Sequence, residues 1–461
     1  MPASLRRREL AAAVLAPFLG RSAPRRPNFL FVLTDDHRHD ALGCSGNRLI
    51  DTPAMDGIAR RGVRFRQACV TMSVCSASRA AILTGRYGSR NGVMGLDAGI
   101  HPGERVFPEL LREAGYRNGY LGKWHLKSPA NPEQAAFETA AWFYSNGAHF
   151  DRHVTEFGRP AVAPGFLEDY LAGHAVRFLE QTARDPRPFF LHLSTQLPHL
   201  DHRMRWNARP ETLARYKARR VRAPASWNDA LGGKPEYLKT CRNRMQGLKY
   251  GYDRRERIEE HTREYWAAIT ELDACLSCVF EALRRLGLEE NTWVMLAGDN
   301  GWFLGEHGFT SKVLPYEESI RIPLLAAGPG ARRGAVRDEL VLNADIAATI
   351  LDLARAGPPA GLHGRSFAAL LRGEGEPGWR DGAYYEGLRP ELGARPTRAL
   401  RTRKRKYIQT LDERTRSKIE FEELYDLERD PGERNNLASR PESAAVLDEM
   451  KARLSRLAAT L

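Results

Sequence analysis

Short apolar runs that end in charged or polar residues alternate with helical patterns, and this alternation restricts the fold more than any other feature. The runs predict buried strands at Asn28–Thr34, Arg117–Leu121, Pro188–Ser194, Thr292–Gly298 and Pro323–Ala327. Helical spacing of apolar residues lies between them, at Ser78–Thr84, Val106–Ala114, Leu167–Thr182 and Ile258–Leu286, and a further helix is expected after the last strand, at Asp345–Arg355. This order predicts an α/β fold, with a mostly parallel sheet sandwiched by helices. Ligands of such sheets bind beyond the carboxyl ends of the strands.

The chain of 461 residues is long enough for one large domain and a small one. We expect a large domain at 27–355, a linker rich in Gly and Pro at 356–380, and a small α+β subdomain at 381–461. Within the subdomain the sequence predicts antiparallel strands and a terminal helix, at Ala383–Tyr385, Lys406–Leu411, Leu424–Asp426 and Glu442–Leu457. Residues 195–257, rich in Arg, Pro, Trp and Asn, are expected to form long loops and short helices over the ligand site.

Residues 1–26 have the order of an export signal. Arg6, Arg7 and Arg8 precede an apolar run at 11–19, and a polar, basic segment follows up to Arg26. This pattern resembles a twin-arginine leader and predicts export to the periplasm or out of the cell. The alternative is a frayed basic tail. No stretch approaches the roughly 18 apolar residues that a membrane span needs.

The formal net charge of +13 favours anionic partners through long-range steering. No nucleic-acid-binding module is recognisable, so a sulfated or phosphorylated small substrate suits the charge better than DNA or RNA. The six cysteines are too few for a disulfide scaffold in a chain of this length. Cys275 and Cys278 have CxxC spacing inside a helical pattern, where packing is favoured over zinc or redox chemistry.

Two acidic clusters each follow a predicted buried strand. Thr34-Asp35-Asp36-His37 ends the first strand, and Gly298-Asp299-Asn300-Gly301 ends another. Either cluster alone is also typical of a solvated turn or helix cap. Because both close parallel strands, we expect them to meet at one edge of the sheet. Adjacent carboxylates repel each other unless a cation or an arginine neutralises them. A hard divalent ion bound by oxygen is the natural solution, which predicts a metal site.

Four further segments carry groups suited to an anionic ester. Cys75 precedes a short predicted helix, whose free N–H groups favour an anion. Lys123 and His125 alternate around Trp124 and would project to one face of an extended segment. His199 follows Pro198 in the loop after a strand, and Lys312 lies twelve residues beyond Asn300. Taken singly, a structural role is favoured for Cys75, and a lone histidine or lysine is usually a surface residue.

Together these segments resemble the formylglycine-dependent sulfatases of the alkaline phosphatase superfamily, over about residues 26–329. The family's motif is Cys or Ser, any residue, Pro or Ala, any residue, Arg, then small and apolar residues and Thr-Gly. Here it reads CSASRAAILTG from Cys75 to Gly85. Its companions are present in order as LTDDH, GKWH, PH, GDNG and LGEHG with a downstream lysine. The resemblance implies an alkaline-phosphatase-like fold and a sulfuric ester hydrolase.

The resemblance implies how the nucleophile is made. Cys75 is oxidised to formylglycine by a separate maturation enzyme, and the hydrated aldehyde supplies the attacking oxygen. The implied metal is one calcium ion, held by the formylglycine at Cys75 and by Asp35, Asp36, Asp299 and Asn300. Oxygen ligands alone would also accept magnesium.

The resemblance also assigns the remaining roles. Asp299 lies at the position of the base that activates the nucleophile, and Arg79 steadies the hydrate. Lys123 and Lys312 clamp the sulfate. His199 donates a proton to the leaving alcohol, while His125 helps to expel sulfate from the diol. His37 and His307 receive no catalytic role, since packing and subsite contacts are equally plausible for them.

One position departs from the commonest form of the motif: Ala77 stands where proline is usual, which bears on the maturation enzyme that accepts this chain. The favoured substrate is a sulfated sugar, such as an N-acetylglucosamine 6-sulfate of glycosaminoglycan type. Two alternatives remain at this point. One is a formylglycine-dependent phosphonate monoester or phosphodiester hydrolase, and the other is an inactive sugar-binding relative.

Overall fold

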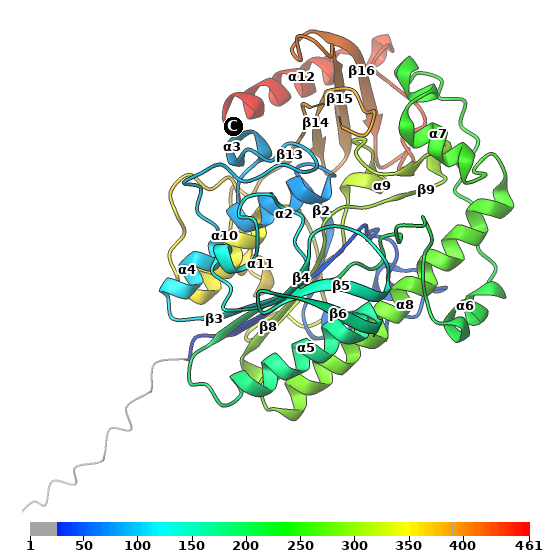
Figure 1. Ribbon diagram of the computed structural model, residues 1–461. Helices are drawn as coiled ribbons and strands as arrows, with labels where there is room; N and C mark the ends of the chain where they lie inside the picture. Colours follow the sequence, from blue (N-terminus) through cyan, green and yellow to red (C-terminus); the bar gives the residue numbers. More distant parts are fainter. Residues whose placement is uncertain (1–24, 390) are drawn as a thin grey trace, which may run out of the picture.

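The computed structural model describes residues 25–389 and 391–461. A ten-stranded sheet with helices on both faces forms the centre of the protein, and the C-terminal part of the chain forms a second sheet of four strands (Figure 1). The predicted export segment at 1–26 lies almost wholly outside the described residues. No helix in the described part of the chain is long and apolar enough to cross a membrane.

The large sheet is mostly parallel, as the sequence predicts. Its strands follow the order β12-β2-β11-β8-β1-β7-β3-β4-β5-β6. Their bounds are β1 (Asn28–Thr34), β2 (Val63–Cys69), β3 (Arg117–Lys123), β4 (Thr139–Phe143), β5 (Phe150–Glu156), β6 (Arg159–Phe166), β7 (Phe189–Ser194), β8 (Thr292–Gly298), β11 (Leu324–Ala327) and β12 (Ala335–Leu342). Strands β8, β1, β7 and β3 run parallel to one another. Every residue of β1 and β8 is buried, because helices cover both faces here.

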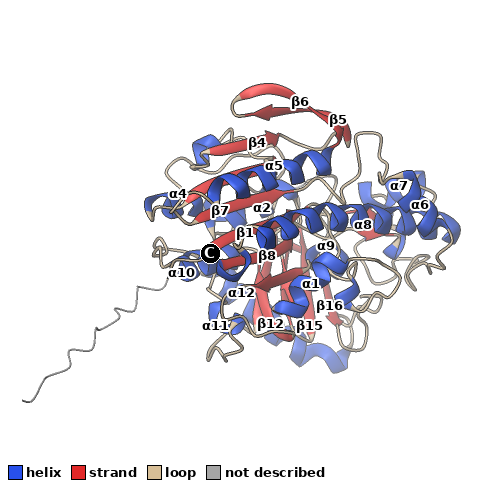
Figure 2. Cartoon of the chain, turned by 90° about the horizontal axis from the view of Figure 1, so that it is seen from below, coloured by secondary structure: helices blue, strands red, loops and turns tan. Residues whose placement is uncertain are grey.

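Helices pack on both faces of the large sheet, and each face has its own hydrophobic core (Figure 2). One face carries α2 (Cys75–Thr84), α4 (Phe107–Glu113), α10 (Asp345–Ala354) and α11 (Ala368–Leu371). The other carries α1 (Pro53–Arg61), α5 (Leu167–Thr182) and the 31-residue α8 (Arg255–Arg285). The parallel order of the central strands therefore brings their carboxyl ends to one edge, between these two layers of helices.

The sequence did not predict five strands of this sheet, namely β2, β4, β5, β6 and β12. They lie away from its centre, and several expose one face, so their residues mix charged and apolar side chains. In β2, Arg64 and Arg66 alternate with the buried Val63 and Phe65. The run at 323–327 does form β11, but this strand is antiparallel to both β8 and β2. An apolar run specifies burial and leaves strand direction open.

Short elements fill the connections, as expected for residues 195–257. That segment contains α6 (Pro210–Lys217), α7 (Arg242–Lys249) and the 3-10 helix η3 (Glu236–Lys239), joined by loops. The remaining short elements are α3 (Gly88–Asn91), α9 (Glu317–Ile320), β9 (Phe303–Leu304), β10 (Thr310–Ser311), η1 (Gly43–Ser45), η2 (Glu133–Ala135), η4 (Glu289–Asn291), η5 (Glu306–Gly308) and η6 (Pro441–Ser443).

The C-terminal sheet is antiparallel, in the order β13-β14-β15-β16. Its elements are β13 (Gly382–Gly387), β14 (Thr397–Thr402), β15 (Arg405–Leu411), β16 (Ile419–Asp426) and the packed helix α12 (Ala444–Ala459). Between the two sheets, residues 356–380 include α11, and Phe367 and Leu370 there are buried in the core beneath the large sheet. The domain boundaries given above stay a prediction.

A buried ion-pair network joins the C-terminal sheet to the segment after β10. Arg401 of β14 donates two hydrogen bonds to Glu317 of α9, at 3.0 and 2.8 Å. Lys406 of β15 lies 2.8 Å from carboxylate oxygens of both Glu317 and Glu433. Because these charges are buried, each needs its partners. The network therefore fixes α9, which begins five residues after Lys312, against the C-terminal sheet.

Candidate active site

The two acidic clusters meet at the carboxyl ends of β1 and β8. Thr34 and Gly298 are paired in the parallel register, so the residues that follow them leave the sheet side by side. The backbone N–H of Asp299 donates to the carbonyl of Thr34 over 2.9 Å. The N–H of Asp36 in turn donates to the Asp299 carboxylate over 3.1 Å. The predicted meeting of the clusters is confirmed.

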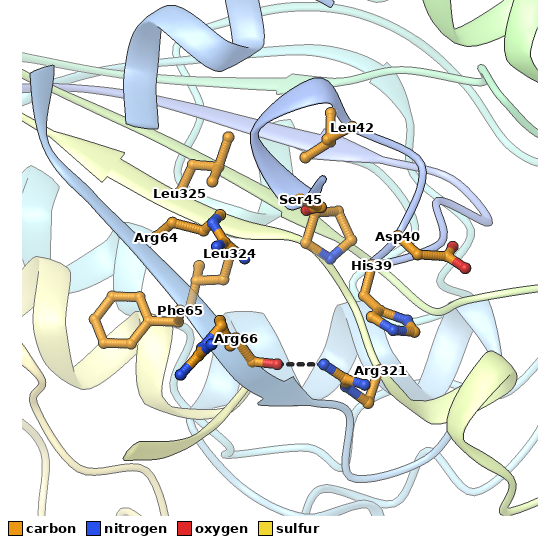
Figure 3. Close-up of a pocket in the computed structure, with 11 residues that line it drawn as sticks. His39, Asp40, Leu42, Ser45, Arg64, Phe65, Arg66, Arg321, Leu324 and Leu325 are labelled. Carbon is orange, nitrogen blue, oxygen red and sulfur yellow. Dashed lines mark hydrogen bonds between the residues drawn. The ribbon is translucent and has the colours of Figure 1, made fainter. Parts of the chain in front are cut away.

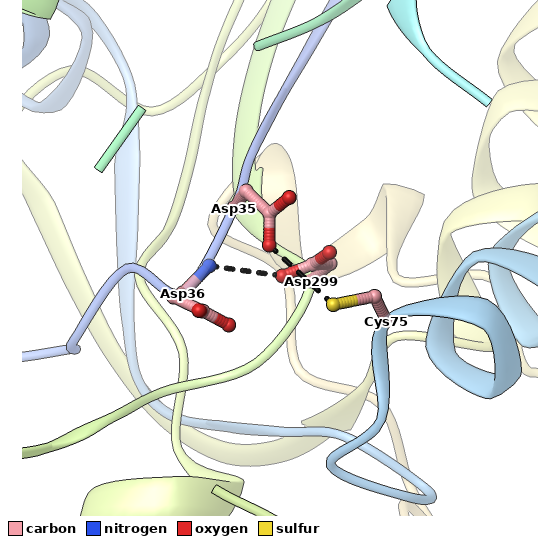
Figure 4. Close-up of side chains that lie close together, drawn as sticks. All are labelled: Asp35, Asp36, Cys75 and Asp299. Carbon is pink, nitrogen blue, oxygen red and sulfur yellow. Dashed lines mark hydrogen bonds between the residues drawn. The ribbon is translucent and has the colours of Figure 1, made fainter. Parts of the chain in front are cut away.

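Asp35, Asp36, Asp299 and Cys75 converge on one buried point (Figure 4). One ligand atom from each lies within 4.8 Å of all the others. Asn300 adds an amide whose nitrogen donates to Asp36 over 2.6 Å. Within the described residues, Asn300 Oδ1 and Asp36 Oδ2 are buried without a hydrogen-bond partner. Three carboxylates and an orphaned amide oxygen fit a hard divalent cation such as calcium.

Cys75 lies at the centre of this cluster. It is the first residue of α2, three residues earlier than the predicted helix start at Ser78, and its side chain is 1% exposed. Its Sγ is 3.5 Å from Asp35 Oδ1 and accepts a hydrogen bond from Lys312 Nζ over 2.7 Å. Burial, reinforced by the charge of Asp35, raises the pKa of the thiol to about 12. The unmodified side chain is therefore an uncharged thiol at neutral pH.

Three cations surround the carboxylates. Arg79 donates to one oxygen of Asp299 through Nε and Nη2, at 3.1 and 2.9 Å. Lys123 donates to Asp35, and Lys312 donates to Asp36. All three cationic side chains are nearly inaccessible to solvent. Three positive charges balance three carboxylates, so a bound divalent cation would leave a positive site that suits an anionic ester.

The adjacent carboxyls of Asp35 and Asp36 have pKa values shifted in opposite directions. Burial opposes ionisation of Asp35, but nearby positive groups, Lys123 first among them, hold its pKa well below the usual range. Burial raises the pKa of Asp36 to about 6, and repulsion from Asp35 adds to this against the attraction of Lys312. Two neighbouring carboxylates that resist joint ionisation are typical of a site built around extra positive charge.

The two predicted catalytic histidines lie at this cluster and are uncharged. His199 Nε2 is 3.3 Å from Asp36 Oδ2, and Nδ1 is 2.7 Å from the carbonyl oxygen of Leu200. Burial lowers the pKa of His199 to about 3. Burial, with the nearby charges of Lys123 and Arg79, lowers that of His125 to about 2. The backbone of His125 has φ 60°, so the extended segment predicted for residues 123–125 is wrong beyond Lys123.

Two site residues were missed by the sequence analysis. Asn146, in the loop between β4 and β5, accepts a hydrogen bond from Lys123 and contacts His199. Ser194, at the end of β7, accepts a hydrogen bond from Arg79 Nη1 over 2.5 Å. Ser194 has a sequence signal, because it ends a predicted strand at the ligand edge. Asn146 has none, since only the path of a loop brings it to the site.

The remaining histidines and cysteines have structural surroundings. His37 is buried, with its ring nitrogens 3.1 and 3.2 Å from the Thr34 hydroxyl and the Ala41 carbonyl. His307 pairs with Asp229 of the 195–257 segment over 2.7 Å and so ties the turn at Glu306–Gly308 to it. The six cysteines are free thiols, and Cys275 is packed in a core while Cys278 is exposed.

Known proteins match this chain over most of its length. A family model described as Sulfatase matches residues 27–356, and one described as N-sulphoglucosamine sulphohydrolase, C-terminal, matches residues 305–460. An N-acetylglucosamine-6-O-sulfatase of Bacteroides thetaiotaomicron is 29% identical, over 92% of this chain and 85% of that protein.

Two solved structures are informative neighbours. One is a protein in complex with its substrate D-glucosamine-2-N,6-O-disulfate, with a TM-score of 0.85 and 27% identity, covering 95% of this chain and 98% of that one. The other is a phosphonate monoester hydrolase of Silicibacter pomeroyi, with a TM-score of 0.75 and 20% identity, covering 93% and 94%. At that identity the second likeness concerns the fold alone.

Proposed function

Because this chain belongs to the sulfatase family and is a sulfuric ester hydrolase, we propose that it removes a sulfate ester from a sulfated sugar. The favoured substrate class is a glucosamine carrying a 6-O-sulfate. The observation that carries the proposal is the convergence of Cys75 with three buried carboxylates and the ammonium of Lys312. The family motif begins at this same cysteine.

We propose that Cys75 acts after oxidation to formylglycine by a maturation enzyme. The hydrated aldehyde would supply the attacking oxygen and, through its second hydroxyl, the means to release sulfate. A position among Asp35, Asp299 and Lys312 suits such a group, because carboxylates accept protons from its hydroxyls and the ammonium stabilises negative charge. Ala77 is compatible with the family motif, which admits alanine at that position.

The other side chains have roles that follow from their contacts. Lys123 and Lys312 would bind the sulfate oxygens, since their ammonium groups flank the cluster. Asp299 would accept the proton of the attacking hydroxyl, because burial and the charge of Asp35 raise its pKa, while Arg79, bound to the same carboxylate, opposes that rise. His199 would carry a proton to the oxygen of the leaving sugar, and His125 would take one when sulfate departs.

Calcium is the ion we propose for the cluster, held by oxygens of Asp35, Asp36, Asp299 and Asn300. When bound, it would add positive charge beside the sulfate and lower the cost of the charge that develops on the ester oxygens. The donor set supports this choice, because all four side chains offer hard oxygen atoms and no imidazole takes part.

The proposed preference for a glucosamine 6-sulfate is based on two similar proteins. One is an N-acetylglucosamine-6-O-sulfatase, and another binds a glucosamine 2-N,6-O-disulfate as its substrate. This chain matches both over most of their length, 85% of the first protein and 98% of the second. The net charge of +13 also suits a polyanionic sugar substrate. Export to the periplasm or out of the cell remains part of the proposal through the predicted leader at 1–26.

The test uses the full-length enzyme, produced together with a formylglycine-generating enzyme. Sulfate release is measured from N-acetylglucosamine 6-sulfate, N-acetylglucosamine 3-sulfate and glucosamine 2-N-sulfate. We expect the 6-sulfate to be preferred by at least about tenfold in kcat/KM. Preference for another position would overturn the sugar assignment. Turnover of a phosphonate monoester with none of any sulfate ester would move the protein to the phosphonate class.

A further inference from the structure

A second pocket lies on the large sheet, away from the Cys75 cluster (Figure 3). It encloses about 260 Å³ between strands β2 and β11 and the segment that follows the metal-binding turn of β1. Its polar lining comes from Arg64, Arg66, Arg321, His39, Ser45 and Asp40. None of these residues belongs to the candidate active site. Figure 3 shows Arg64, Arg66 and Arg321 around one opening.

The positive charge of this pocket is only partly neutralised. Within residues 25–389 and 391–461, Arg64 forms no ion pair, whereas Arg66 pairs with Asp338 over 2.5 Å. Arg321 lies 3.6 Å from Glu317, but that carboxylate is already bound more closely by Arg401 and Lys406. One carboxylate, Asp40, also lines the pocket.

Asp40 forms its ion pair with Arg38, which does not line the pocket. Arg38 binds it with two parallel hydrogen bonds, at 2.9 and 2.8 Å. Such a bidentate pair neutralises the carboxylate and fixes its orientation. The lining therefore has an excess of positive charge, contributed mainly by Arg64 and Arg321.

Among the residues that the structure describes, two that line the pocket have a buried polar atom that forms no hydrogen bond. Arg321 Nε and His39 Nδ1 are both buried and form no hydrogen bond in the described part of the chain, although Arg321 Nε lies 3.6 Å from the Glu317 carboxylate. The guanidinium of Arg321 is held in place, because Nη2 donates to the backbone carbonyl of Arg66 over 2.5 Å. A fixed, buried donor without an acceptor costs free energy unless a ligand or water meets it.

We propose that this pocket binds a small oxyanion, either inorganic sulfate or the sulfate or carboxylate group of a sugar. Arg64 and Arg321 would contact the oxyanion, with the Ser45 hydroxyl as a further donor. Guanidinium groups suit this ligand, because their planar donors match the oxygens of sulfate and carboxylate. The volume of about 260 Å³ has room for one such group with its sugar ring.

The proposed oxyanion site does not depend on the proposed sulfatase activity. It is tested by measuring how far a bound anion occupies the pocket. Crystals of the protein are soaked in selenate, an isostere of sulfate, and anomalous density is measured over a concentration series. A second arm soaks the Cys75→Ala variant in glucosamine 6-sulfate. Selenate in the pocket identifies a free oxyanion as ligand, and occupancy only in the second arm identifies the anionic group of a sugar.

Arg64→Gln is the decisive variant, with Arg48→Gln as its matched control. Arg48 is exposed, lies in the neighbouring loop and carries the same charge, but does not line the pocket. We expect Arg64→Gln to weaken occupancy by about tenfold or more, since a charged hydrogen-bond partner is lost, and Arg48→Gln to leave it unchanged. Equal unfolding temperatures for the two variants show that folding is intact. The proposal is overturned if the pocket stays empty in both arms, or if Arg64→Gln binds as well as the control.

Discussion

Lys123 donates a hydrogen bond from Nζ to the side-chain oxygen of Asn146 over 2.6 Å. This contact fixes the orientation of the amide, so its nitrogen faces His199 Nε2 at 2.6 Å. An amide nitrogen is only a donor, and His199 Nε2 must therefore accept. The ring proton of neutral His199 then lies on Nδ1, which donates to the Leu200 carbonyl over 2.7 Å. Asn146 thus links the orientation of Lys123, the proposed sulfate ligand, to the tautomer of His199, whose Nε2 would have to gain a proton before it could donate one to the leaving sugar.

We expect Asn146→Ala to lower kcat for the sulfate ester by about 10- to 100-fold, a typical loss for a group that orients a catalytic side chain. The pH profile of kcat should also shift, because His199 loses a contact that fixes its tautomer. Both are measured with an aryl sulfate across pH 5 to 9. Asn435→Ala, at an exposed position, serves as the control. An unchanged pH profile would show that Asn146 does not act through His199.

Metal binding and activity should be lost together in Asp299→Ala. In the wild type, we expect elemental analysis to find about one calcium ion per chain, and added calcium to raise the unfolding temperature by a few degrees through binding to the folded state. The variant should show neither effect, since a carboxylate shared by the site is removed. Asp253→Ala, at an exposed position, should behave as the wild type. Full calcium content in Asp299→Ala would show that the ligand assignment is wrong.

The shifted pKa of Glu168 predicts how the free energy of unfolding changes with pH. Its Oε1 accepts the backbone N–H groups of Gln196 and Leu197 at 3.0 and 2.9 Å, beside the loop of His199. Burial raises its pKa from 4.5 to about 7. Between these values the folded protein keeps a proton that the unfolded chain releases. The free energy of unfolding therefore falls, through this group, as pH rises from 4.5 to 7, and stays level above 7.

Glu168→Gln keeps the accepting oxygen and removes the titration. Relative to the wild type, the variant should gain stability as pH rises across that window, and urea unfolding at pH 5 and pH 8 measures the difference. Glu236→Gln, whose side chain is 81% exposed, is the control and should show no such change. A difference between Glu168→Gln and wild type that is the same at both pH values would contradict the prediction.

Arg401→Met tests the buried network that joins the C-terminal sheet to α9. We expect the free energy of unfolding to fall by about 3 kcal/mol, because Glu317 would stay buried with less compensating charge. Unfolding followed by both circular dichroism and tryptophan fluorescence should remain one transition. Arg403→Met, at a side chain that is 61% exposed, should cost far less. Equal losses in the two variants would mean that the buried network contributes little.

The central part of the fold could be predicted from the sequence because burial on both faces leaves unbroken apolar runs. Such runs mark β1 and β8, and the polar residues after them identify one edge of the sheet. The meeting of Asp36 with Asp299 follows from parallel pairing. Strands nearer the edges, such as β2, carry charged residues on one side and resemble loops or surface helices in sequence.

Side-chain relationships that depend on the path of a loop could not be predicted. Asn146 reaches Lys123 and His199 from a loop with no motif of its own. The left-handed backbone at His125 likewise breaks the simple alternation that its spacing suggests. Arg64 and Arg321 belong to strands and turns far apart in the chain, so only the folded sheet brings them around one pocket.

The most direct test of the central claim compares three aryl esters that differ only in the group transferred: a sulfate, a phosphate and a phosphonate monoester. Wild-type enzyme, produced with a formylglycine-generating enzyme, is assayed beside Cys75→Ala, and the mass of the peptide containing Cys75 reports its oxidation. We expect the sulfate to be hydrolysed fastest, and Cys75→Ala to lose at least about 1,000-fold in kcat, as when a covalent nucleophile is removed. Substantial sulfate hydrolysis by Cys75→Ala, or a preference for a phosphorus ester by fully oxidised enzyme, would contradict the account.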